Sequence, residues 1–348
     1  MILLLFGILL IVCIFSFLEN KGYSITLRWE YIYWAIGGIL ILYAGLKPLG
    51  IDNDGLGYEY MFSLCDNPSS TLAIEFTFTY ISKLVHLISS DVHYLFLIYA
   101  AIGVIIKMLA FKKLLPLFFL PLSIYISHIF ILHDFTQIRA AIASALLLYS
   151  IPFLYNRNKR TCLIIYSIAV CFHYSALLFF FLLFISNNIS YKEKILLLSI
   201  IPIGFVFYFI KMNFLGYIPF FGEKIETYQK LTEQGIGAEI NPFNMVYLVR
   251  IAIYYYCFIF YDTIKENVKY IPILLKIMGI SIFSFTFFSF MPVMSFRISE
   301  LFSIVDIIVF SSIYFTIKQK NIATAIVAAI CFSLFFIDIF YNKYIINA

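Results

Sequence analysis

Charged residues are scarce in this chain of 348 residues: only 12% are Asp, Glu, Lys or Arg, whereas 63% are hydrophobic. A soluble domain of this composition could not cover its own surface with polar groups. The net charge of +5 does not indicate a nucleic-acid groove, because the basic residues stand in short clusters between apolar runs. The sequence therefore predicts an integral membrane protein that binds no nucleic acid.

Paired cysteines are lacking as well. The six cysteines form no Cys-x-x-Cys pair, and all but Cys65 lie within or at the edge of apolar stretches. They resemble membrane-core residues, so we expect no disulfide framework and no metal site. The first eighteen residues have no basic start and no small-residue cleavage site, which favours a retained helix over a signal peptide. No internal repeat is visible, and residues 1–348 are expected to form a single polytopic membrane domain.

Apolar runs are what the sequence has in abundance. A run of about 20 apolar residues spans the hydrocarbon core of a bilayer. Such runs lie at about 2–18, 30–47, 91–110, 114–132, 138–155, 161–185, 195–211, 244–261, 271–291, 298–317 and 321–341. The predicted fold class is an all-α polytopic integral membrane protein with about 10–12 transmembrane helices.

Short basic clusters separate these runs and predict the topology. They are Lys21 with Arg28, Lys107 with Lys112 and Lys113, Arg157 with Lys159 and Arg160, Lys192 with Lys194, Lys265 with Lys269, and Lys318 with Lys320. The positive-inside rule places all of them in the cytoplasm, so an even number of crossings must separate consecutive clusters. One interval, between Arg160 and Lys192, contains the single run 161–185. Either this run is a broken or re-entrant hairpin with polar His173 at the break, or it is one ordinary helix and the lysines are a local exception.

Two long polar segments, at about 50–90 and 213–243, fall on the external side by the same argument. In the first, Glu75, Thr79, Lys83 and His86 repeat at helical spacing and predict a short interfacial helix. The second has a helix-like stretch around 223–234. Long loops of this kind are often binding loops or lids, and solvated connectors are the alternative.

Isolated charges within or beside the apolar runs are candidate functional residues. An ionised side chain at the bilayer centre costs about 2.5–3.5 kcal/mol, so it usually lines a polar cavity. Arg139 stands at the start of a run of small residues, where the helix dipole is positive, and its planar guanidinium suits phosphate oxygens. Arg139, Arg250 and Arg297, all on the external half, form a candidate diphosphate site. Snorkelling of Arg139 and ion pairs with Glu75, Glu300 or Asp306 are the alternatives.

His173 is a candidate proton acceptor or phosphate contact, because imidazole titrates near physiological pH. A core histidine with its hydrogen bonds satisfied is the alternative. The external carboxylates could each act as a general base, or could be solvated loop charges or helix caps. These are Asp52, Asp54, Glu75 and Asp134.

Several short elements follow one another in a recognisable order. They are Gly50-x-Asp52 followed by Tyr58, then Glu75 with Phe78, then IRAAIA with Arg139, then FHYSA with His173 and Tyr174. In this order they resemble the EpsG family of bacterial polysaccharide polymerases, which is related in role to the O-antigen polymerase Wzy. The resemblance runs from about 45 to 310 and is most specific at 134–178. The family often has Gln after the arginine, where this chain has Ala140.

The resemblance implies a glycosyltransferase of the bacterial cytoplasmic (inner) membrane that acts on the external or periplasmic face without a metal or another cofactor. It would transfer a growing glycan from undecaprenyl diphosphate to a sugar hydroxyl of another lipid-linked repeat unit. Its implied partners are undecaprenyl-diphosphate-linked oligosaccharides, a chain-length regulator and a flippase. The implied catalytic residues are His173, Asp52 and Glu75. The implied diphosphate- or sugar-binding residues are Arg139, Arg250, Arg297, Tyr58, Tyr174 and Gln137.

Two other functions stay open at the level of sequence. A flippase or transporter of lipid-linked oligosaccharides would also need buried arginines, but no pseudo-symmetric halves with matching interrupted helices are visible. A membrane O-acyltransferase acting on glycans would need a histidine partnered by an acid, for which His173 and Asp134 could serve.

Overall fold

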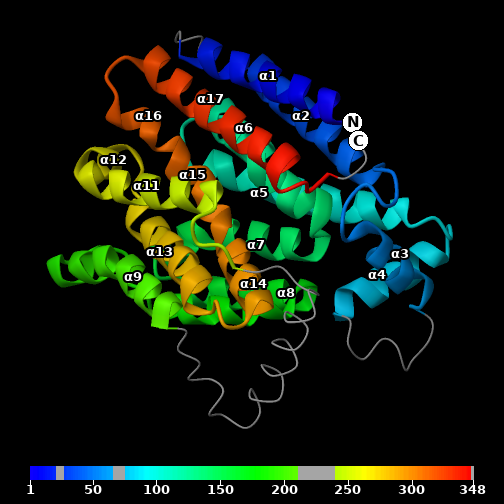
Figure 1. Ribbon diagram of the computed structural model, residues 1–348. Coiled ribbons are helices and arrows are strands. Elements are labelled where there is room, and N and C mark those ends of the chain that lie inside the picture. Colours follow the sequence, from blue (N-terminus) through cyan, green and yellow to red (C-terminus); the bar gives the residue numbers. More distant parts are fainter. Residues whose placement is uncertain (21–26, 66–74, 211–239, 346–348) are drawn as a thin grey trace.

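The computed structural model describes residues 1–20, 27–65, 75–210 and 240–345, and this part of the chain is helical throughout its regular structure (Figure 1). The first half comprises α1 (Ile2–Glu19), α2 (Leu27–Gly45), α3 (Gly55–Ser63), α4 (Phe76–His86), α5 (His93–Leu114), α6 (Phe119–Ile124), the π-helix η2 (Tyr125–Thr136), α7 (Ile138–Tyr155), α8 (Lys159–Phe172) and the 3₁₀ helix η3 (Tyr174–Phe184). The second half comprises α9 (Tyr191–Ile210), α11 (Met245–Ile259), α12 (Tyr261–Asn267), α13 (Ile271–Phe287), α14 (Pro292–Phe302), η5 (Ser303–Val305), α15 (Asp306–Ser311), α16 (Ile313–Thr316), α17 (Lys320–Phe336) and η6 (Ile337–Tyr341).

The predicted class, an all-α polytopic membrane protein, is confirmed. By length and composition, 7 helices of the described chain can cross a membrane, and 8 if α11 and α12, which meet at an angle of 85°, form one broken span. Two further apolar helices, η3 and α13, are shorter than such a span. Fewer crossings than apolar runs are found on these criteria because some runs, such as 161–185, are divided into short helices.

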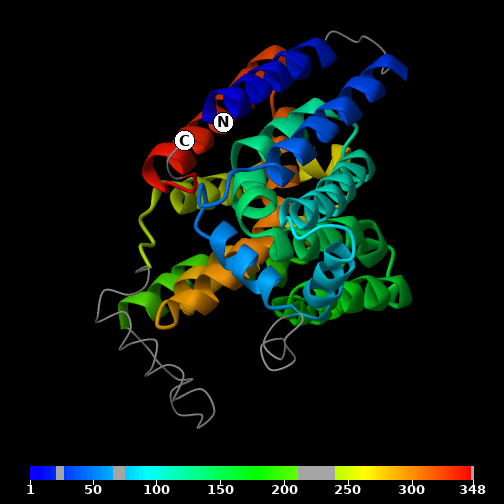
Figure 2. The ribbon, with the colours of Figure 1, turned by 90° about the vertical axis from the view of Figure 1, so that its right-hand side faces the viewer.

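The ends of the chain meet in the bundle. Helices α1 and α17 lie side by side in both views (Figures 1 and 2). The rings of Phe6 and Phe332 pack with their centroids 5.9 Å apart. Helix α6 and its continuation η2 lie beneath them with every residue buried, so this element forms the centre of the molecule.

The run 161–185 is broken at His173. Helix α8 ends at Phe172, His173 is extended (φ −156°, ψ 117°), and the chain returns as η3. The return is shown by Tyr166, whose ring lies 5.6 Å from that of Phe179, and by Asn187, which donates a hydrogen bond to the Tyr155 carbonyl at 3.2 Å. The chain is therefore a hairpin here, and residues 160 and 192 lie toward the same end of the bundle.

A polar partner from another helix makes this break tolerable. A helix that stops at membrane depth leaves backbone carbonyls without partners, and these must be satisfied within the protein. The Thr77 hydroxyl of α4 donates to the Cys171 carbonyl at 2.6 Å. Helix α4 thus packs on the end of α8 and fixes the position of His173.

The described basic clusters gather at one end of the bundle. Lys113 at the end of α5 donates to the Tyr149 hydroxyl in the last turns of α7 at 2.6 Å, and Asn20 donates to the Thr324 hydroxyl near the start of α17 at 2.7 Å. Helices α3 and α4 lie at the opposite end, far from α12 and the α16–α17 turn (Figure 1). This separation is the arrangement that the positive-inside rule requires if α3 and α4 are external.

Lys107 was wrongly predicted to be a topology signal. Its ammonium group is buried and lies 2.8 and 2.7 Å from the two carboxylate oxygens of Asp134, whose Oδ2 also accepts a hydrogen bond from Tyr125 at 2.7 Å. Asp134 is therefore not an external carboxylate. Two charges at membrane depth are tolerated here because they neutralise each other inside the bundle. Lys112 and Lys113 alone mark this end of α5.

Helix α4 forms where the interfacial helix was predicted, but with a different buried face. Phe78, Ser82 and Val85 face the protein, and Glu75 at the N-cap is buried with them rather than lying on an exposed polar stripe. Phe76, Tyr80 and other apolar residues of α4 are exposed, as expected of a helix that meets a membrane surface. Most of the second predicted loop, 213–243, lies outside the described residues.

Candidate functional site

A polar cavity of about 630 Å³, called here the main cavity, opens at the end of the bundle that carries α3. Its volume is typical of ligand sites, which measure about 300–1,000 Å³. Its walls come from α3, the start of α7, the break between α8 and η3, helix α14 and the residues that follow η6. The polar residues that line it are Asn53, Asp54, Tyr58, Gln137, Arg139, His173, Arg297, Glu300, Asn342 and Tyr344.

Glu75 contacts two side chains that line this cavity, those of Arg139 and His173. One of its carboxylate oxygens forms an ion pair with Nη1 of Arg139, and the other lies 3.2 Å from Nδ1 of His173. Burial alone would raise the pKa of Glu75, but the hydrogen bond from His173 and the charge of Arg139 outweigh it and lower this pKa below its usual value. Glu75 itself lies behind the cavity wall. It therefore orients the guanidinium and the imidazole that face the cavity.

Aromatic rings complete the setting of Arg139. Its Cζ lies 5.4 Å from the centroid of the Tyr58 ring and 5.8 Å from that of Phe78. Burial raises the pKa of Tyr58 to about 12, so its hydroxyl stays protonated and can donate a hydrogen bond. Arg139 stands in the first turn of α7, where the helix dipole adds positive potential. This wall of the cavity is suited to an anion.

Arg297 and two carboxylates, Glu300 and Asp54, add charged groups to the lining of the cavity. Arg297 and Glu300 are three residues apart on α14 and both line the cavity, and Gln137 donates to Glu300 Oε2 at 2.7 Å. Burial, followed by the negative charge of a neighbouring carboxylate, raises the pKa of Asp54. The main cavity thus offers cations for an anionic group and oxygen acceptors for hydroxyl groups, the two features that a glycosylated phosphate requires.

The structure brings together most of the predicted site. Arg139, Arg297, Tyr58, Gln137 and His173 line the main cavity, with Glu75 directly behind two of them. Their roles in binding or catalysis remain predictions. Besides Glu75, three predicted residues do not line this cavity: Asp52, Tyr174 and Arg250.

Asp52 forms a buried ion pair instead of lining the cavity. It is buried, and its Oδ2 lies 2.5 Å from the Nζ of Lys47, which also donates to the Phe135 carbonyl. This ion pair ties the segment before α3 to the end of α2. Asp54, two residues later, is the carboxylate that faces the cavity. Tyr174 is half exposed on η3 beside His173.

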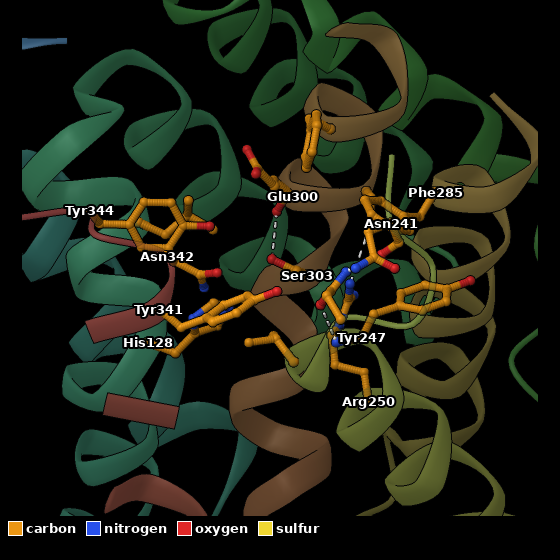
Figure 3. Close-up of a pocket in the computed structure, with 15 residues that line it drawn as sticks. His128, Asn241, Tyr247, Arg250, Phe285, Glu300, Ser303, Tyr341, Asn342 and Tyr344 are labelled. Carbon is orange, nitrogen blue, oxygen red and sulfur yellow. Dashed lines mark hydrogen bonds between the residues drawn. The ribbon is translucent and has the colours of Figure 1, made fainter. Parts of the chain in front are cut away.

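Arg250 lies in a second, smaller cavity of about 190 Å³ (Figure 3). Its Nε donates to Asp306 at 2.6 Å, and its two terminal nitrogens donate to Ser281 at 2.5 Å and Ser299 at 3.2 Å. The predicted convergence of three arginines on one site is therefore not what the structure shows, because this guanidinium is used in a buried network. The two cavities adjoin, and both are lined by Phe296, Glu300, Asn342 and Tyr344.

Several cavity residues were not singled out from the sequence. The spacing of three between Arg297 and Glu300 could have indicated a shared helix face. Asp54, by contrast, was among the candidate general bases, but no feature of the sequence separated it from Asp52. No sequence signal marks Asn342 and Tyr344, which reach the cavity only because the chain turns back after η6.

These features define the class of protein: a polytopic membrane protein with a cation-bearing polar cavity at one end of its helical bundle. A family model described as the EpsG family matches residues 30–347, so the chain belongs to the EpsG family and the predicted resemblance is confirmed. Membership implies a function of the polysaccharide-polymerase type. No curated protein and no solved structure matches the chain.

Proposed function

We propose that this protein polymerises a bacterial surface polysaccharide by transferring a growing glycan from undecaprenyl diphosphate to a sugar hydroxyl of another lipid-linked repeat unit. The observation that carries the proposal is the presence of Arg139, Arg297 and His173 in one cavity of a membrane-embedded EpsG-family chain. A transfer of this kind breaks the bond between the anomeric carbon and the diphosphate oxygen, and the departing diphosphate carries the negative charge that develops.

Fixed cations are what this reaction needs most. Charges that are already oriented toward the leaving group stabilise the transition state without reorganising during the reaction. The planar fork of Arg139 can hold two phosphate oxygens, and Glu75 keeps it and the imidazole of His173 in place. In this proposal His173 contacts the diphosphate, and Asp54, Gln137 and further polar side chains of the cavity hold sugar hydroxyls.

The surroundings of the cavity suit a lipid-linked substrate. Apolar side chains are exposed on α4 and on η3, among them Tyr80, Leu84, Phe181 and Phe184. The polyprenyl tails would lie along such surfaces while the diphosphate enters the cavity. The protein would act in the cytoplasmic membrane with the cavity facing the periplasm or exterior, as the basic clusters at the other end of the bundle support. It would depend on a flippase for substrate and on a chain-length regulator for product size.

The test is polymerisation by the purified protein in liposomes that contain the lipid-linked repeat unit. Arg139→Lys keeps the charge but removes the fork, so we expect kcat/KM to fall by about 10–100-fold, the value of one charge-assisted hydrogen bond. Arg160→Lys is the matched control, because Arg160 is exposed in the first turn of α8, away from both cavities. Its rate should equal that of the wild type.

The proposal also makes a prediction in cells that lack the native gene. Arg139→Ala and His173→Ala should reduce surface glycan from a ladder to a single repeat unit, while both variants still insert into the membrane. A full ladder from both variants would contradict the site assignment. Precursor that accumulates in the cytoplasmic leaflet would instead indicate a flippase.

A further inference from the structure

The second cavity contains a histidine–carboxylate pair that the diphosphate site does not use. Nδ1 of His128 lies 2.5 Å from Oδ2 of Asp338, and Asn342 donates to the other oxygen of Asp338 at 2.9 Å. Asp338 is completely buried and has both oxygens engaged. The carboxylate is thus fixed, and it fixes the plane of the imidazole in turn.

The other ring nitrogen of His128 faces the cavity. His128 lines it together with Tyr341 and Asn342 (Figure 3), and Nε2 has no hydrogen-bond partner among the residues that the structure describes. When a carboxylate accepts the Nδ1 hydrogen, Nε2 carries the lone pair and can accept a proton. This is the arrangement of a general base.

The backbone around the pair is unusual on both sides. His128 belongs to the π-helix η2, and Asp338 belongs to the π-helix η6. Helical segments of this type are rare and are frequently found at functional sites. Residues that are 210 positions apart in sequence are brought together by two such segments.

The size and lining of this cavity fit a sugar. Its volume of about 190 Å³ is below the roughly 300–1,000 Å³ of sites that bury a whole drug-sized ligand, so it admits one sugar ring rather than an oligosaccharide. Tyr247, Phe285 and Tyr341 supply aromatic surface, and Asn241 supplies an amide group (Figure 3). Because Glu300 and Phe296 line both cavities, a sugar in the second cavity lies next to a ligand in the main cavity.

We propose that the second cavity is the acceptor-sugar subsite and that His128, oriented by Asp338, is the general base for the transfer. This assignment rests on the proposed polymerase function. Nε2 of His128 takes the proton of the acceptor hydroxyl, and the oxygen bonds to the anomeric carbon of the donor. The bond from that carbon to the diphosphate breaks, and its electron pair leaves with the diphosphate. The protonated His128 then releases its proton to water.

Donor and acceptor functions can be separated by substrate design. The donor probe is the repeat unit on undecaprenyl diphosphate. The acceptor probe is the same repeat unit as a benzyl glycoside, which offers the hydroxyl but has no leaving group. We expect His128→Gln to lower kcat by about 100- to 10,000-fold, the range of a general base, with the Kd of the donor unchanged.

Asp338 is a positioning residue, so its variant should behave differently. Asp338→Asn should lower kcat by about 10–100-fold, the value of a charge-assisted hydrogen bond, with the KM of both probes unchanged. Imidazole added to His128→Ala should restore turnover in a saturable way, which loss of packing alone would not allow. His93→Gln is the matched control, since His93 forms a pair with Asp91 at 2.6 Å away from both cavities.

The outcomes separate the two proposals. If the wild type joins the two probes and both His128→Gln and Asp338→Asn keep the wild-type kcat, the assignment of the base is wrong and the proposed polymerase function is unaffected. A wild-type protein that joins no probes overturns the polymerase function and the assignment with it. If His128→Gln does not fold, Asp338→Asn decides alone: reduced kcat at unchanged KM supports the assignment, and an unchanged kcat refutes it.

Discussion

Glu75→Gln should separate the effect of the shape of the Glu75 side chain from the effect of its charge. The amide has the same shape as the carboxylate but no charge, so Arg139 loses its ionic partner and His173 loses the carboxylate that its Nδ1 contacts. Glu75 is buried, with 6% of its side chain exposed, whereas 22% of the Arg139 side chain is exposed to the cavity. Arg139 can therefore regain some hydration. We expect the variant to lose about 1.5–3 kcal/mol of unfolding free energy, the value of one hydrogen bond to a charged group, rather than the larger cost of stranding a fully buried charge.

Thermal unfolding of the detergent-solubilised protein, followed by tyrosine and tryptophan fluorescence, measures this loss. Because the pKa of Glu75 in the folded state is lowered below its usual 4.5, its stabilising effect is fully present above pH 4.5 and is lost as the pH falls through the lower, folded value. The wild type should therefore lose stability on acidification more steeply than Glu75→Gln does. The same variant should lower kcat/KM of polymerisation by about 10–100-fold.

Glu30→Gln is the matched control, because Glu30 pairs with Lys112 where both side chains are partly exposed, away from the cavities. Exposed pairs contribute little, so neither stability nor activity should change measurably. Equal unfolding midpoints and equal activities for Glu75→Gln and the wild type would refute the role of Glu75 as the group that orients Arg139 and His173.

Three further results are expected. Asp54→Asn should raise the unfolding temperature at neutral pH, because the raised pKa of Asp54 means that its ionised carboxylate costs stability there. This gain should vanish when the pH falls below 3.8, and thermal scans at the two pH values measure the difference. Arg250→Met should destabilise the protein by about 3–5 kcal/mol by leaving Asp306 buried without its partner, and adding Asp306→Leu should restore most of that loss in denaturant titrations. Chelation with EDTA should leave the polymerisation rate unchanged, because Arg139 and Arg297 supply the positive charge for the diphosphate.

Composition sufficed to predict the fold class, whereas the charge clusters left two alternatives for the run 161–185, of which the structure shows the broken hairpin. The hairpin alternative follows from counting, because clusters at Arg160 and Lys192 require an even number of crossings and the apolar run between them is too short for two full spans. The same rule misassigned Lys107. A lysine near the end of an apolar run has the position of a topology signal, and only the buried contact of its ammonium group with Asp134, 27 residues away in sequence, shows that it is not one.

The sequence predicted Arg139, Arg297, His173 and Glu75 as site residues, but it could not distinguish Asp54 from Asp52. Arg139 and His173 were recognisable because an ionisable side chain is rare and costly in an apolar run. Asp52 and Asp54 are two residues apart in a polar segment, and the distinction depends on Lys47, whose ammonium group lies beneath Asp52 in the fold. Local spacing carries no information about that contact.

The second cavity was not predicted from the sequence, although an ion pair with Asp306, which the structure shows for Arg250, was named as an alternative. Arg250 and Asp306 are 56 residues apart, and His128 and Asp338 are 210 residues apart. Both pairs lie within apolar helices, where periodicity reports which face is buried but not which polar side chains meet. His128 and Asp338 come together only because η2 packs against α17, the helix that continues into η6.

The affinity for undecaprenyl diphosphate, the leaving product of the proposed reaction, tests the central claim most directly. The double variant Arg139→Gln/Arg297→Gln should bind it at least about 100-fold more weakly than the wild type in nanodiscs, since two charge-assisted contacts are lost. Arg160→Gln, far from the cavity, should bind it as the wild type does. An equal Kd for all three proteins would contradict a diphosphate site in the main cavity.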